Sequence, residues 1–208
     1  MFDADLISTW TESYVNEPES IRTARHASME HGVEPVTPAV GSYLASLVAI
    51  TGAQSLVEIG TGLGVASQWL IHGNPEAHLT TIEKDVDHLH SAKDLMVAAG
   101  IPTARVRGIS GDASDILPRM NEATYDLVLV NATSKGVLDF VRHALRLARP
   151  GGLVVLTHAL GGGHVANPAK RDATTTELRT ILGDYAVDEH VRATLVPVGD
   201  GVLTLVKS

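Results

Sequence analysis

The stretch Ser55-Leu-Val-Glu-Ile-Gly-Thr-Gly-Leu-Gly64 is the most informative part of the sequence. Residues Leu56 to Ile59 have the character of a buried strand, and glycine then occupies every second position. Glycine tolerates positive φ angles and lets the backbone approach a ligand closely, and residues 65–72 are predicted to form a helix whose free N–H groups point at the loop. The pattern predicts a strand, a loop that binds a nucleotide-like cofactor, and a helix. A plain tight connection between strand and helix is the alternative.

The composition of the 208 residues is that of one globular domain. Of these residues 44% are hydrophobic and 19% are charged, and no Pro- or Ser-rich linker divides the chain. A chain of this length and composition can bury one sizeable core. We therefore expect a single domain over 1–208, with covering helices in 1–51 and the cofactor-binding sheet and a C-terminal hairpin in 52–208.

Charge, cysteine count and hydropathy exclude several classes of protein. The net charge is −8 and the basic residues are scattered, which argues against a nucleic-acid partner and favours a small molecule. The absence of cysteine excludes disulfides and thiolate metal ligands and fits a cytoplasmic location. The N-terminus has no basic segment followed by an apolar core, and no apolar run approaches the roughly 20 residues that span a bilayer. We expect neither targeting nor membrane insertion.

Apolar periodicity predicts strands alternating with helices along most of the chain. The predicted strands are 56–59, 78–83, 104–109, 125–131, 152–158, 191–196 and 202–207. The predicted helices are 5–14, 19–31, 38–51, 65–72, 85–99, 113–120, 136–148 and 174–182. Such alternation predicts an α/β fold with a doubly wound, mostly parallel sheet and a ligand at the carboxyl ends of its strands. The last two strands are joined so closely that they must be antiparallel, which predicts a reversed strand at the C-terminus.

Two acidic residues follow predicted strands at positions suited to a nucleoside. Glu83 ends the second strand, 23 residues beyond Gly60, where a carboxylate can accept hydrogen bonds from both ribose hydroxyls. A solvated acid at a strand end is the alternative. Asp112 and Ala113 follow the third strand, where an adenine would lie, and for Asp112 the alternative is a simple helix N-cap.

These residues together resemble the S-adenosylmethionine-dependent O-methyltransferases of the catechol and caffeoyl-CoA type. The likeness runs from about Val36 to the C-terminus and rests on six segments: Glu58-Ile-Gly-Thr-Gly-Leu-Gly64, Thr81-Ile-Glu83, Gly111-Asp-Ala-Ser-Asp-Ile-Leu-Pro118, Tyr125-Asp-Leu-Val-Leu-Val, Pro150-Gly-Gly152 and Pro197-Val-Gly-Asp-Gly201.

The resemblance implies a Rossmann-like sheet of seven strands with the last one reversed, and a frequent homodimer. It also implies a set of residues that bind S-adenosyl-L-methionine: Val36, Glu58, Gly60, Gly62, Glu83, Asp112, Ala113 and Asn131. The family usually has a serine two residues after the last loop glycine, to hold the methionine carboxylate. This chain has Ala66 there, and we expect Ser67 to take that role.

The catalytic half departs from the family pattern. The family commonly has an Asp at the end of the fourth strand and an Asp-Asn pair at the end of the fifth, which bind Mg²⁺ or a similar ion. This chain has Asn131 and Thr157-His158, and the next positions after Asn131 carry Thr133, Ser134 and Lys135. Because Mg²⁺ selects oxygen ligands that include carboxylates, we predict no metal site and no use of a divalent metal.

Asn131 and His158 are the predicted catalytic residues. An imidazole has an unperturbed pKa near 6.5, so His158 is suited to act as general base at neutral pH. The chain has nine other histidines, and a structural role for His158 is the alternative.

The sequence therefore favours an S-adenosylmethionine-dependent O-methyltransferase that acts on a small hydroxylated acceptor. A protein that binds the cofactor without catalysis, as a partner or regulator, is the second interpretation, since the metal positions are degraded. A nicotinamide-dependent oxidoreductase is the third, and it is disfavoured because its fingerprint is G-x-G-x-x-G rather than G-x-G-x-G. Residues that shape the acceptor site are expected in the N-terminal helices and in 161–168.

Overall fold

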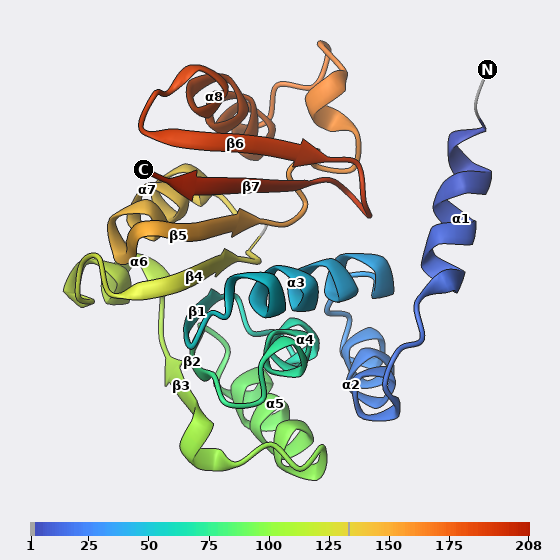
Figure 1. The fold of residues 1–208 in the computed structure, drawn as a ribbon. Coiled ribbons are helices and arrows are strands. Elements are labelled where there is room, and N and C mark those ends of the chain that lie inside the picture. Colours follow the sequence, from blue (N-terminus) through green and yellow to red (C-terminus); the bar gives the residue numbers. More distant parts are fainter. Residues whose placement is uncertain (1–2, 133) are drawn as a thin grey trace.

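A computed structural model of the chain describes residues 3–132 and 134–208 and contains one seven-stranded sheet (Figure 1). The order of the strands in the sheet is β3-β2-β1-β4-β5-β7-β6. The strands are β1 (Ser55–Ile59), β2 (His78–Glu83), β3 (Val106–Ser110), β4 (Tyr125–Val130), β5 (Ala148–Leu156), β6 (Val191–Val196) and β7 (Val202–Lys207). Chain order reverses direction between β1 and β4, and in open α/β sheets ligands bind at that switch point.

The strand directions confirm the predicted mixed sheet. β1 pairs in parallel with both β2 and β4, and β4 pairs in parallel with β5. β7 is antiparallel to β5 on one side and to β6 on the other, so it is the reversed strand. The C-terminal hairpin is thus part of the central sheet and extends it beyond β5.

Helices cover both faces of the sheet, as the alternation of elements predicts. They are α1 (Ala4–Tyr14), α2 (Glu19–Glu30), α3 (Pro38–Thr51), α4 (Val65–Gly73), α5 (Val86–Ala98), α6 (Ala113–Ile116), α7 (Val137–Leu147) and α8 (Ala173–Val187), with 3₁₀ turns η1 (Thr103–Arg105), η2 (Leu117–Arg119) and η3 (His164–Ala166). Leu56 and Leu127 face the core formed with α2, α3 and α4. Their neighbours Val57 and Val128 face the core formed with α7 and α8, because successive strand residues point to opposite faces.

The first helix stands apart from the sheet (Figure 1). Its main polar attachment is Glu12, whose carboxylate accepts hydrogen bonds from the Thr37 hydroxyl at 2.7 Å and from the Ala39 backbone N–H at 2.8 Å. These two groups lie at the N-terminus of α3, where backbone N–H groups lack helical partners. Glu12 therefore caps a neighbouring helix, while most of α1 remains exposed.

Several element boundaries differ from the predictions, among them the start of β5 at Ala148 rather than 152 and of β3 at Val106 rather than 104, and two of the other differences have clear local causes. β5 ends at Leu156 rather than at residue 158, since His158 has a φ angle of 54°, which no strand accommodates. The helix predicted over 113–120 is α6 followed by η2, because Pro118 lacks the N–H that an α-helix would use. α8 runs to Val187, beyond the predicted end at 182.

None of the helices in the described parts of the chain, 3–132 and 134–208, is long and apolar enough to cross a membrane.

Candidate active site

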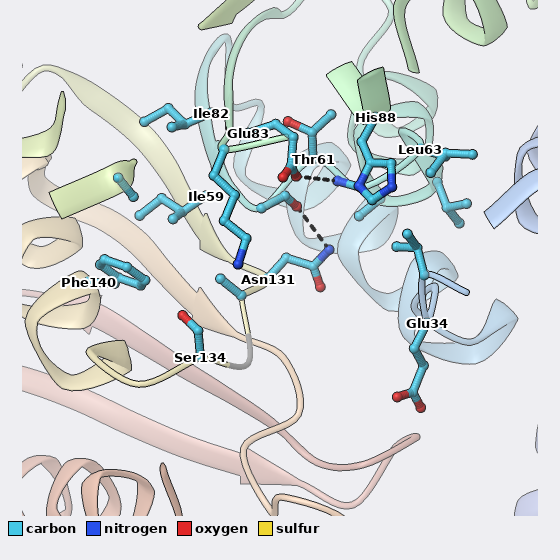
Figure 2. A pocket seen from close by; sticks show the side chains of 18 of the residues that line it. Glu34, Ile59, Thr61, Leu63, Ile82, Glu83, His88, Asn131, Ser134 and Phe140 are labelled. Atoms are coloured by element: carbon cyan, nitrogen blue, oxygen red, sulfur yellow. Dashed lines mark hydrogen bonds between the residues drawn. The ribbon is translucent and has the colours of Figure 1, made fainter. Parts of the chain in front are cut away.

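A cavity of about 490 Å³ lies at the carboxyl ends of β1, β2 and β4 (Figure 2). Glu83 and Asn131 reach it from two strand ends, Ser134 and Phe140 lie on one side, and Glu34 lies at the opposite rim with its carboxylate pointing outward. Of the predicted site residues, it is lined by Val36, Gly60, Gly62, Glu83, Asp112, Ala113 and Asn131. The fold thus brings together residues from five separate stretches of the sequence.

The glycine loop forms one wall of this cavity. Gly60, Gly62 and Gly64 have φ angles of 92°, 52° and 83°, which side chains rarely allow. A Cβ on Gly60 would lie 3.0 Å from the Asn131 carbonyl oxygen, and one on Gly62 would lie 3.1 Å from Cγ1 of Val33. Backbone conformation therefore favours glycine at both positions, and at Gly60 the nearby backbone of Asn131 and Ala132 also leaves little space for a side chain.

The Glu83 carboxylate is fixed by backbone donors. Its Oε2 accepts a hydrogen bond from the Gly62 N–H at 2.9 Å, and its Oε1 accepts one from the Asp85 N–H at 3.1 Å (Figure 2 shows the first). The residue is 8% exposed and lines the cavity. Each oxygen of a carboxylate has two acceptor sites, so both retain capacity for a ligand hydroxyl. Glu83 is therefore more constrained than a solvated acid at a strand end.

A second carboxylate lies beneath the glycine loop. Glu58 is fully buried, and its Oε2 accepts hydrogen bonds from the hydroxyls of Ser67 and Thr81, the latter at 2.7 Å. Its Oε1 is buried without a hydrogen-bond partner. Burial raises the pKa of the Glu58 carboxyl to about 7, against the lowering effect of the two hydroxyls. Neither Glu58 nor Ser67 lines the cavity.

The alternation of side chains along β1 explains this placement. Val57 and Ile59 point to the face covered by α7, so Glu58 points to the face covered by α4, which carries Ser67. Whether Glu58 and Ser67 contact a cofactor stays a prediction. In the structure they support the loop from below.

The other predicted cofactor residues line the cavity and also hold local structure. Asp112 accepts a hydrogen bond from the Ser114 N–H at 2.8 Å, so it is the N-cap of α6. Val36 is buried, and its carbonyl accepts a hydrogen bond from Arg25, which pairs with Glu17 at 2.6 Å. A capping role and a binding role are compatible for Asp112, since its side chain is at the cavity.

The other wall begins at the end of β4 with the neutral Asn131 and continues through Ser134 and Lys135, whereas Thr157, after β5, does not line the cavity. The Asn131 amide donates to the Gly60 carbonyl at 3.3 Å, and its Oδ1 accepts a hydrogen bond from the Thr157 hydroxyl at 2.7 Å. His158 does not line the cavity, and its Nδ1 lies 3.8 Å from Oδ2 of Asp200. The structure therefore brings Asn131 to the cavity and turns His158 toward the hairpin.

This donor set does not fit Mg²⁺. The oxygens of Asn131 and Thr157 are hydrogen-bonded to each other, and neither is a carboxylate. Among residues 3–132 and 134–208, no three His, Cys, Asp or Glu side chains gather closely enough to hold a metal ion. Thr133 lies outside the described residues. Independence from a divalent metal stays a prediction.

Several lining residues were not predicted individually. They include Ser28, Val33, Glu34, Lys84, His88 and Phe140. Ser28 comes from α2, as expected for acceptor-shaping helices, whereas residues 161–168 do not line the cavity. Of these residues, only Lys84 could have been predicted from the sequence to line the cavity, because it directly follows Glu83. The others depend on packing between distant segments.

Comparison with known proteins identifies the family. The O-methyltransferase family profile matches residues 11–208. A Mycobacterium marinum protein named "Putative O-methyltransferase" is 40% identical over 205 residues, which cover 98% of this chain and 92% of the relative.

Two solved structures share the fold over the whole of this chain. The O-methyltransferase TomG from Streptomyces achromogenes, crystallised with S-adenosylmethionine, is 29% identical with a TM-score of 0.86, over 100% of both chains. Cofactor-bound Rv0187 from MTB is 26% identical with a TM-score of 0.86, over 100% of this chain and 98% of its own. This chain belongs to the O-methyltransferase family, and the resemblance found in its sequence is confirmed.

Proposed function

We propose that this protein binds S-adenosyl-L-methionine in the cavity and transfers its methyl group to an oxygen of a small hydroxylated acceptor. The observation that carries the proposal is the Glu83 carboxylate, held by two backbone N–H groups beside the glycine loop. A carboxylate so held is suited to the two hydroxyls of a ribose. TomG, which shares this fold, was crystallised with the same cofactor.

In this proposal, different lining residues contact different parts of the cofactor. Glu83 accepts from the ribose, and Asp112 with Ala113 contacts the adenine. Val36, Gly60 and Gly62 surround the methionine part, where only glycine leaves room for close approach. Glu58 and Ser67 support the loop from beneath it.

The cofactor supplies an activated methyl group, and the protein holds the acceptor oxygen in line with that group. Asn131 is held from both sides, by Gly60 and Thr157, so its amide is a fixed element of the wall that the acceptor would meet. Holding two reactants in line removes much of the entropic barrier to their reaction. His158 lies outside the cavity lining, with Nδ1 3.8 Å from Oδ2 of Asp200, so its role as general base stays a prediction that rests on its place after β5 in the sequence.

Titration calorimetry with S-adenosylhomocysteine tests the binding site. Glu83→Ala removes hydrogen bonds to a charged acceptor and should weaken binding roughly tenfold to a hundredfold. Glu34→Ala removes an equal charge at the rim, where solvent screens it, and is the matched control that should change the affinity less than about threefold. An unchanged Kd for Glu83→Ala would overturn the ribose assignment.

Methyl transfer tests the activity. The protein is incubated with radiolabelled cofactor and a panel of catechols and phenols, and label in the acceptor is measured. Tight cofactor binding with no transfer to any acceptor would favour the second interpretation, a cofactor-binding partner or regulator. His158→Gln tests the predicted general base: a transfer rate about 100-fold lower at unchanged cofactor affinity would support it, and an unchanged rate would show that His158 is structural.

A homodimer in the cytoplasm, without nucleic-acid or membrane partners, completes the proposal. The absence of cysteine supports the cytoplasm, the net charge of −8 argues against nucleic acid, and the homodimer rests on the family resemblance alone. The molecular mass in solution and fractionation of cells that express the protein test these two points.

A further inference from the structure

The wall of the cavity that follows β4 carries a positive charge. Lys135 lines the cavity there, together with Ser134 and Phe140. Within the described ranges, 3–132 and 134–208, none of the ion pairs involves Lys135. The Lys135 ammonium therefore lies at the cavity without a carboxylate partner from these parts of the chain.

The three carboxylates that line the cavity belong to other parts of it. Glu83 accepts hydrogen bonds from backbone N–H groups beside the glycine loop, and Asp112 caps α6. Glu34 points outward, and Figure 2 shows it across the cavity from Ser134, the residue before Lys135. The positive charge of Lys135 is thus placed on the side of the cavity where none of these three acids lies.

The backbone next to Lys135 is held in place from α8. The carboxylate of Glu177 accepts hydrogen bonds from the N–H groups of Gly136, at 2.9 Å, and Leu138, at 3.2 Å. The Val137 N–H between them donates to the Ser134 carbonyl at 3.2 Å. Because these groups at the start of α7 are already paired, the helix end offers no donors to a ligand, and the Lys135 ammonium is the group left to bind an anion.

We propose that the acceptor carries a carboxylate besides the hydroxyl group that is methylated, and that Lys135 binds this carboxylate. The inference rests on the proposed function and names its substrate class. Ile59 and Phe140 lie on the same side of the cavity as Ser134 and offer apolar surface to a ring (Figure 2). The acceptor is then a hydroxylated aromatic acid.

The number of available cations favours a carboxylate over a phosphate group. Lys84 directly follows Glu83, and Nδ1 of His88 lies 4.0 Å from Oδ2 of Asp85, so these two basic residues belong to the proposed ribose side. One ammonium remains for the acceptor, which matches a single negative charge, whereas a phosphate group carries up to two charges and three acceptor oxygens. The net charge of −8 would repel an anionic acceptor, so a local cation is needed to bind one.

Titration calorimetry on the full chain saturated with S-adenosylhomocysteine tests the charge preference. The probes are protocatechuate and its primary amide, which have similar shapes and differ in charge at neutral pH. The wild type should bind the carboxylate at least about fivefold more tightly than the amide, as expected for an ion pair open to solvent. Lys135→Gln should abolish this preference, and Lys135→Arg should retain it. Lys170→Gln, which removes an exposed lysine outside the cavity lining, is the matched control and should also retain it.

Two further titrations test whether the cation serves the cofactor instead. Lys135→Gln should bind S-adenosylhomocysteine within about threefold of the wild type, and a loss above about tenfold would mean that Lys135 binds the carboxylate of the cofactor. Lys84→Gln removes an equal charge next to Glu83 and should keep the preference between the probes. Loss of the preference in Lys84→Gln but not in Lys135→Gln would show that the wrong lysine is assigned. Circular dichroism confirms that each variant folds, as expected for substitutions at exposed positions.

Three other results would overturn the inference: equal affinity of the wild type for both probes, no binding of either probe, or an unchanged preference in Lys135→Gln. Because the probes are titrated into the complex with S-adenosylhomocysteine, these results do not require methyl transfer. A preference that depends on Lys135 without transfer to any acceptor would contradict the proposed function alone. Transfer to neutral phenols as efficient as transfer to acidic ones would contradict this inference alone.

Discussion

The two walls of the cavity are built from different chemical groups. On the β1 and β2 side, the Glu83 carboxylate accepts from two backbone N–H groups, and a second carboxylate, Glu58, lies beneath the loop. On the β4 side, the strand ends in the neutral Asn131, which accepts a hydrogen bond from Thr157 outside the cavity lining, and the ionisable His158 is turned away. Negative charge is thus concentrated on one wall.

From this difference we infer that one wall provides the affinity for the cofactor and that the other positions the reacting groups. Fixed carboxylate acceptors bind hydroxyl groups strongly, so in the proposed function the first wall supplies specificity for the cofactor. Neutral amide and hydroxyl groups that are already paired supply shape and position, with little capacity to bind a hard cation. The family architecture therefore retains its binding side here, and we predict that its reacting side works without direct coordination of the acceptor by a metal ion.

Truncation after Gly199 should have the largest effect, because it removes the support of the second wall. It deletes β7, whose Val202, Leu203 and Leu205 are buried, and it exposes the edge of β5. Each such side chain is worth about 1.5–3 kcal/mol, and the sum reaches the typical stability margin of about 5–15 kcal/mol. We expect an unfolded protein by circular dichroism. Native spectra and unchanged melting would show that the hairpin is an appendage.

The matched control for the truncation is Leu195→Ala in β6. Leu195 is 43% exposed, and β6 is the edge strand of the sheet. Replacing its side chain with alanine therefore removes less buried apolar area than deleting the buried residues of β7. The free energy of unfolding of the Leu195→Ala variant should be lower than that of the wild type by less than about 1 kcal/mol.

Glu58→Gln should have the next largest effect, and only at neutral and higher pH. The folded-state pKa of Glu58 is about 7, above its ordinary value of 4.5, so the folded state binds the proton more tightly. The stability this provides is complete below about pH 4.5 and is lost as the pH rises through about 7. The shift corresponds to about 3 kcal/mol. The glutamine side chain in the variant cannot ionise, and its amide oxygen still accepts from Ser67 and Thr81.

Urea unfolding of the cofactor-free protein across pH 4.5 to 8 measures this effect. The difference in unfolding free energy between Glu58→Gln and the wild type should grow in favour of the variant as the pH rises. Other groups whose pKa values are lowered, such as Asp126, contribute equally to both proteins and cancel. A difference that does not change with pH would mean that Glu58 keeps an ordinary pKa.

Asn131→Asp should have a smaller effect of about 1–2 kcal/mol on folding, by placing a negative charge on the neutral wall. The Asn131 amide donates to the Gly60 carbonyl, and a carboxylate there would face that oxygen without a proton to share. Asn167→Asp is the control: the exposed Asn167 already accepts from the Ala169 N–H through Oδ1, and a carboxylate preserves that bond. Equal stability of both variants in urea would show that the second wall tolerates charge.

Local patterns were sufficient to predict the sheet, the reversed strand and the cofactor wall. The glycine loop and the acid at the end of β2 are read from adjacent residues, since strand, turn and helix signals act over a few positions. Their gathering at one cavity follows from parallel strands, whose carboxyl ends share one edge.

The remaining features depend on contacts that no local pattern records. Glu58 and Ser67 belong to the right motif, yet they lie below the loop because α4 covers their face of β1. His158 turns toward Asp200 because its backbone is left-handed, a conformation rare for residues other than glycine.

The smallest effect should come from removing divalent metal. Because the Asn131 and Thr157 oxygens are occupied by each other and His158 offers one nitrogen, the chain presents no carboxylate set at these positions. A ligand that binds only the folded state raises its stability, so chelator and Mg²⁺ should each shift the melting temperature of the wild type by less than about 1 °C. Methyl transfer to any accepted phenol should be equally insensitive.

The control for metal independence is a variant that restores the oxygen ligands of the family pattern. Combining Asn131→Asp, Thr157→Asp and His158→Asn supplies two carboxylates and an amide, which suit a hard cation, so this variant should gain a melting shift on addition of Mg²⁺. Loss of wild-type transfer with chelator and its recovery with Mg²⁺ would instead mean that carboxylates elsewhere in the chain bind the ion. The contrast between a charged binding wall and a neutral reacting wall would then be wrong, because the reacting wall would acquire its charge from the metal and those ligands.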